Sequence, residues 1–245
     1  MGARVADRHL GHHRRSQRSG DALVTRRPLR RHAPCAAWLR DERGVAMLEL
    51  ALVLPLFLGF VLTGLEFGNW VMANNRTQRM ASMTADLVAQ SGVGAIGASE
   101  KQIYDLFSAV DLTAQPFDLR NHGRVVISSV KGTDNDGDGV VERRFLWQRF
   151  DGAYTAAAPL LGCARTTPLA TLPSTRVLPL DEILFHVQVT YDYQPLFSRR
   201  PFGWINLGTA ITRQATYRAR STQFQTPSSV SRFPAKSNCT SANGL

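Results

Sequence analysis

The sequence predicts an α+β protein with a long N-terminal transmembrane helix, a short second helix and an antiparallel sheet of about four strands. Three observations support this prediction. One apolar stretch near the N-terminus is long enough to cross a membrane as a helix. Apolar residues then recur at helical spacing, and the second half of the chain alternates apolar and polar residues as half-buried strands do.

The positive charge of the chain is concentrated before the apolar stretch. Of 245 residues, 29 are basic and 19 acidic, so the formal net charge is +10. Residues 1–43 hold 11 arginines and only four acidic residues. Arginines on one side of an apolar segment are typical of the cytoplasmic flank of a membrane helix. We therefore expect a basic cytoplasmic leader at residues 1–44 and no nucleic acid as a partner.

The apolar stretch runs from Val45 to Leu65 and is interrupted only by Glu49. At about 1.5 Å per residue it would form about 31 Å of helix, which matches the hydrocarbon core of a bilayer. We assign a transmembrane helix to residues 45–71, an exported periplasmic domain to residues 72–221 and a polar C-terminal tail to residues 222–245.

A cleaved secretory signal is the alternative reading of the same segment. Small residues at Val71-Met72-Ala73 would suit a signal peptidase, and the mature chain would then begin at Asn74. The long basic leader and the position of Glu66 argue against this alternative.

Two glutamates on the apolar helix need a physical explanation, because a carboxylate in lipid is unfavourable. Glu66 is expected near the outer end, where its side chain reaches headgroups and water. Glu49 lies close to the inner end, and it either extends to the interface in the same way or is compensated by a nearby cation. If the chain is cut after Gly44, the new α-ammonium of Val45 would be such a cation, from the same or an adjacent subunit.

The residues at this point resemble a pilin processing signal. Gly44 precedes the apolar stretch and Glu49 is the fifth residue after it, as in the class III prepilin signal. The following run ELALVLPLFLGFVLTGLEFG is similar to the TadE/TadG family of minor pseudopilins from tight-adherence (Flp) pilus systems. Residues 74–90 and the segment VQVTYDYQPLF, residues 187–197, are similar to that family as well.

This resemblance implies a fate and a set of partners for the chain. It implies cleavage between Gly44 and Val45 by a membrane aspartyl prepilin peptidase, and a structural role in assembling an adhesive pilus and its secretion machinery. The implied partners are that peptidase, other pilins and pseudopilins, inner-membrane assembly proteins and the lipid bilayer. The chain would be a single-pass protein of the bacterial inner membrane, with a cytoplasmic N-terminus and a periplasmic C-terminal domain. An uncleaved, membrane-anchored periplasmic binding module is the alternative.

Beyond the membrane, the helix is expected to continue to about Gln90. An incomplete apolar stripe supports it, formed by Met72, Met80, Met83, Leu87 and Val88. Ser99 and Gln102 then form a capping box, which predicts a second helix over residues 100–111.

Four segments alternate as strands, at residues 124–131, 140–150, 183–193 and 211–221, with a Pro/Thr-rich connector at residues 153–180. The third is the clearest. Its apolar and aromatic residues point to one side and its polar residues, such as His186 and Gln188, to the other. We expect only one of its faces to be buried.

The turn between the first two strands contains Asp134, Asp136 and Asp138, which match the first half of a calcium-binding loop. The twelfth position of that pattern is Phe145 rather than a glutamate. A polar hairpin tip and a weak calcium site both remain open. No other cofactor is expected.

Of the three cysteines, Cys35 belongs to the leader, so Cys163 and Cys239 are a candidate disulfide in an oxidising compartment. Two free thiols are the alternative.

No sequence motif of a hydrolase or metalloprotease occurs, and four of the six histidines lie in the leader. The glycines of the G-x-G-x-x-G run at residues 92–97 follow a predicted helix instead of a strand, which argues against nucleotide binding. We expect the chain not to be an enzyme.

Overall fold

The computed structural model describes residues 44–91, 98–172, 178–197, 209–220 and 226–245. The leader up to residue 43, with Cys35, and the glycine run at residues 92–97 lie outside the described residues. The chain divides into two units, residues 1–52 and 53–245. The sheet and the helical segments that pack on it belong to the second unit.

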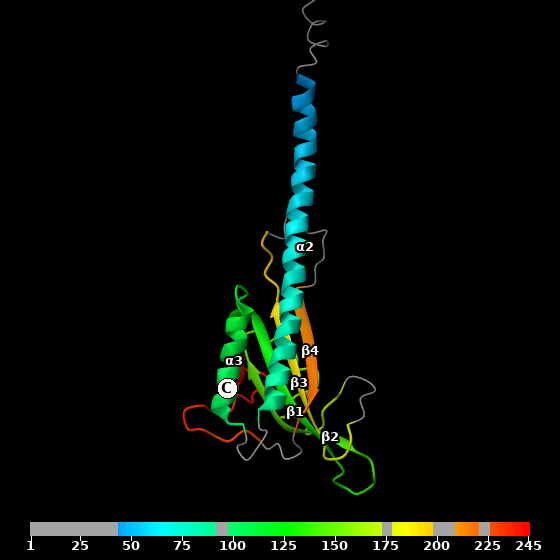
Figure 1. Ribbon diagram of the computed structural model, residues 1–245, viewed down its shortest axis with the longest axis vertical. Helices are drawn as coiled ribbons and strands as arrows, with labels where there is room; N and C mark the ends of the chain where they lie inside the picture. Colours follow the sequence, from blue (N-terminus) through cyan, green and yellow to red (C-terminus); the bar gives the residue numbers. More distant parts are fainter. Residues whose placement is uncertain (1–43, 92–97, 173–177, 198–208, 221–225) are drawn as a thin grey trace, which may run out of the picture. The chain divides into compact units, whose positions relative to one another are not determined.

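The elements confirm the predicted α+β class (Figure 1). The helices are α2 (Val45–Gln90), α3 (Glu100–Ala114), the short α4 (Leu119–His122) and a 3₁₀ turn, η2 (Ala242–Gly244). The strands are β1 (Gly123–Thr133), β2 (Glu142–Asp151), β3 (Ile183–Asp192) and β4 (Ala210–Arg218). They form one antiparallel sheet in the order β2-β1-β3-β4. Helix α4 is too short to show a periodic pattern in the sequence and was not expected.

One face of the sheet packs against α3 and the C-terminal half of α2 (Figure 1). The predicted apolar stripe on α2 is partly wrong, because Met72, Met83 and Leu87 are exposed. The residues that α2 buries are mostly small, namely Ala73, Thr77, Ala81, Thr84, Ala85 and Ala89, together with Met80, Val88, Asn74 and Glu66. Small side chains allow the helix backbone to lie close to the large side chains of the sheet, such as Phe185.

Helix α3 begins at the predicted capping box. The Gln102 amide donates to the Ser99 hydroxyl, and the Ser99 amide donates to the Gln102 side chain. Ile103, Phe107 and Val110 recur at helical spacing and are buried against the sheet.

The prediction that β3 buries only one face is wrong. His186, Gln188 and Thr190 are each only 2% exposed. The connector covers this side of the sheet and supplies hydrogen bonds to its polar groups: Gln188 accepts from the Leu160 amide at 2.8 Å and donates to the Ala158 carbonyl at 2.9 Å. The alternation of apolar and polar residues in β3 therefore corresponds to one apolar and one polar face, both of them buried. Polar side chains tolerate burial when they are hydrogen-bonded.

The C-terminal segment from residue 226 packs onto the same domain. Its Lys236 forms a buried ion pair with Asp151, and its Ser228 exchanges backbone hydrogen bonds with the start of α3. The guanidinium of Arg124, 1% exposed, donates to the carbonyl of Cys239 at 2.6 Å. Burial lowers the pKa of Arg124, and the carbonyl oxygens compensate part of the lost hydration.

Cys163 and Cys239 are joined by a disulfide across 76 residues of sequence. This disulfide links the connector, which covers the polar face of the sheet, to the C-terminal segment. Both segments therefore depend on a covalent link as well as on hydrogen bonds.

A Cys163→Ser/Cys239→Ser double variant is expected to lose about 4 kcal/mol of unfolding free energy, because the unfolded chain regains the entropy of a long loop. Urea unfolding of the detergent-solubilised protein measures this loss. Cys35→Ser is the matched control and should leave the unfolding free energy unchanged. Equal stability of the double variant and the control would contradict a stabilising bridge.

Candidate functional site: the junction of the apolar helix and the sheet

The predicted processing site lies at the beginning of α2. Gly44 and Val45 are exposed, and the helix begins at Val45. Glu49 lies one turn further along and is exposed, and among the described residues no ion pair forms with it. Processing at this position stays a prediction, and the carboxylate of Glu49 is open to contact from outside the described part of the chain.

Glu66 is placed quite differently from the expectation that it reaches headgroups and water. Its side chain is buried, with 8% of the residue exposed. One carboxylate oxygen accepts a hydrogen bond from the Tyr193 hydroxyl at 2.7 Å. The other accepts from the backbone amides of Leu196 at 3.0 Å and Phe197 at 3.3 Å. These donors compensate the carboxylate for its lost hydration and join α2 to the chain that follows β3.

Tyr193 is the centre of this junction. Its hydroxyl donates to Glu66 and accepts from the Asn69 side-chain amide at 2.8 Å. Burial and the neighbouring Glu66 carboxylate raise the pKa of Tyr193 strongly, so the hydroxyl keeps its proton. Because the pKa of Tyr193 is higher in the folded than in the unfolded state, the protonated hydroxyl contributes to stability below pH ~10. This contribution is lost as the pH rises from the unfolded-state pKa toward the folded-state pKa.

Two signals in the sequence could have identified this contact. Counting back from Met80 in helical steps through Thr77, Ala73 and Trp70 leads to Glu66, which places the carboxylate on the packed face of α2. Tyr193 directly follows β3 and continues the spacing of its apolar side, where a hydroxyl needs a buried partner. The exposed methionines obscured this face of the helix.

The structure brings the three aspartates of the hairpin turn together. Ligand oxygens of Asp134, Asp136 and Asp138 lie within 4.8 Å of one another. The Asp134 carboxylate also accepts from the amides of Gly137 at 2.8 Å and Gly139 at 3.1 Å. These bonds stabilise the turn without an ion, so calcium binding stays a prediction.

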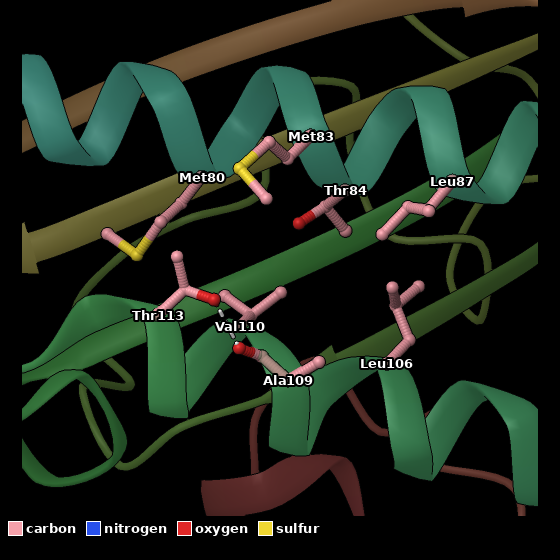
Figure 2. Close-up of a pocket in the computed structure, with 8 residues that line it drawn as sticks. All are labelled: Met80, Met83, Thr84, Leu87, Leu106, Ala109, Val110 and Thr113. Atoms are coloured by element: carbon pink, nitrogen blue, oxygen red, sulfur yellow. Dashed lines mark hydrogen bonds between the residues drawn. The ribbon is translucent and has the colours of Figure 1, made fainter.

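A shallow apolar groove lies between α2 and α3 (Figure 2). Its lining residues are Met80, Met83, Thr84, Leu87, Leu106, Ala109, Val110 and Thr113. Thr113 donates to the Ala109 carbonyl, whereas the buried Thr84 hydroxyl has no hydrogen-bond partner among the described residues. The groove therefore offers mainly apolar contact.

Together, the fold and the junction define a class: an α+β domain carried on one helix that is long and apolar enough to cross a membrane, the one such helix among the described residues. Residues 44–86 match the family described as TadE-like protein. The resemblance is confirmed for this segment, and it indicates a role in tight-adherence pilus systems. No curated protein and no solved structure matches the chain.

Replacing the central hydroxyl tests the junction. Tyr193→Phe removes one donor from a buried carboxylate, and we expect a loss of about 1.5 to 3 kcal/mol of unfolding free energy in urea unfolding of the solubilised protein. Tyr217→Phe is the matched control, since Tyr217 is 41% exposed on the edge strand β4, and its effect should stay within about 0.5 kcal/mol. Equal effects of the two variants would exclude a stabilising role for the hydroxyl.

Proposed function

We propose that this chain is a minor pseudopilin, a structural subunit that is inserted in the bacterial inner membrane and helps to assemble a tight-adherence pilus and its secretion machinery. The observation that carries this proposal is the position of the family match, which begins at Gly44. The same glycine is the residue before the cut in the processing signal. The N-terminus would be cytoplasmic, and the domain that contains the sheet periplasmic.

The first four turns of α2 support a role within the membrane. Residues 44–58 are exposed on every side of the helix, and apolar side chains such as Leu52, Leu56 and Phe57 form most of this surface. Apolar side chains exposed all round a helix are stable in lipid or against other apolar helices. Neighbouring pilins and pseudopilins would provide the second kind of contact.

Glu49 would then have a role in assembly. Cleavage after Gly44 creates an α-ammonium at Val45, one helical turn from the Glu49 carboxylate. The two charges attract each other strongly in a medium of low dielectric constant. An ammonium of the same or an adjacent subunit would compensate the carboxylate and favour one axial register between subunits.

N-terminal sequencing of the protein extracted from membranes tests the processing step. The proposal predicts a first residue of Val45, produced by the prepilin peptidase. A first residue of Met1 would support an uncleaved membrane-anchored module, and a first residue of Asn74 would support a secreted soluble protein.

A pair of glycine variants makes this measurement specific. Gly44→Val places a branched side chain directly before the cut, so the uncleaved chain should accumulate and piliation should be lost. Gly64→Ala is the matched control, because a Cβ there meets nothing within 4 Å, and it should be processed normally. Normal processing of Gly44→Val would contradict the proposed site.

A further inference from the structure

The protein covers one face of α2 well before the helix reaches the sheet. Gly59, Leu62 and Thr63 are half-buried, whereas the helix is exposed all round from residue 44 to residue 58. These three residues lie on the same side of the helix as the buried Glu66, since seven residues make two turns. The cover over α2 thus extends two turns from Glu66 toward the N-terminus.

The level of this cover along the helix places it inside the proposed membrane span. A span that begins at Val45 reaches the outer edge of the hydrocarbon core about 31 Å later, next to Leu65. Gly59 lies roughly 10 Å deeper, by the same rise per residue. The half-buried residues Gly59, Leu62 and Thr63 therefore lie at the level of the outer leaflet and its interface.

The described residues that contact Glu66 from outside the helix are those of the segment Tyr193–Phe197. Glu66 accepts from the Tyr193 hydroxyl and from the amides of Leu196 and Phe197, which holds this segment at the level of the outer interface. Its backbone is anchored, yet the Leu196 side chain is 62% exposed. An apolar side chain fixed at this level faces lipid and not bulk water.

Lipid is favoured over a protein partner as the surface that meets Leu196. The amides of Leu196 and Phe197 are held on Glu66 at the level of the outer interface, where an exposed apolar side chain next to the membrane helix meets headgroups and acyl chains.

We propose that the segment Tyr193–Phe197 is a second membrane contact, which docks on the outer leaflet of the bilayer with the Leu196 side chain in the interface. This inference rests on the proposed membrane span. Glu66 is the positioning residue, because its carboxylate holds the segment against the helix. Two contacts, the span and this segment, restrict rotation of the domain about the helix axis and fix the face that it presents to neighbouring subunits.

Fluorescence quenching in vesicles tests the contact. The full chain with Cys35→Ser and Leu196→Cys is labelled with a small fluorophore, under conditions that keep the Cys163–Cys239 bridge oxidised. It is then reconstituted into vesicles of phosphatidylethanolamine and phosphatidylglycerol that contain lipids with a nitroxide near the headgroup. We expect the label at position 196 to lose most of its emission.

Val140→Cys is the matched control, because Val140 is also 62% exposed. Val140 lies on the loop between β1 and β2. The end of β1 that leads into this loop pairs with Ile183, at the opposite end of β3 from Tyr193. Its label should keep its emission. If both labels keep their emission while the protein resists alkaline extraction from the vesicles, the membrane contact is wrong and the proposed span stands. Extraction of the protein from the vesicles would overturn both.

Glu66→Gln tests the positioning residue. The variant has one acceptor oxygen in place of two, so Tyr193 and the two backbone amides compete for it. We expect quenching at position 196 to weaken while the protein stays in the vesicles. Unchanged quenching in this variant would overturn the role assigned to the Glu66 carboxylate.

Discussion

A single continuous helix has to satisfy two different environments, and the hydrogen bonds of Glu66 lie where one environment gives way to the other. From residue 44 to residue 58, α2 exposes apolar side chains all round, and C-terminal to Glu66 the helix buries a narrow stripe of small residues against the sheet. A carboxylate is unfavourable in either place without donors. Tyr193 and two backbone amides supply these donors to Glu66. The residue that is least compatible with either environment therefore lies where the two environments meet.

The elements with strong local signals were predicted from the sequence. The capping box of Ser99 located the start of α3, and the alternation of β3 located the clearest strand within one residue at its end. The burial of His186 and Gln188 was not predictable, because it depends on a connector that is distant in sequence and has no periodic pattern of its own. The environment of Glu66 was misjudged for the same reason: its partners lie about 130 residues further along the chain.

The family match has a simple physical interpretation in this structure. It covers residues 44–86, which is nearly all of α2, and it includes Glu66 but not Tyr193. The matched segment therefore contains the part that is exposed all round and the face that packs on the sheet. The second side of the junction, with Leu196 and Phe197, comes from outside the matched segment and determines how this domain is held on its helix.

The central claim is that the exposed face of α2 lies in lipid up to Glu66 and in water beyond it. Leu58 and Met72 test it directly, because they are 47% and 56% exposed in the protein itself, so only a membrane distinguishes them. Single cysteines at these positions, in a Cys35→Ser background, are treated with a membrane-impermeant maleimide in intact cells whose outer membrane has been permeabilised. The account predicts rapid labelling at position 72 and labelling at position 58 only after detergent is added. Equal labelling at both positions without detergent would contradict it.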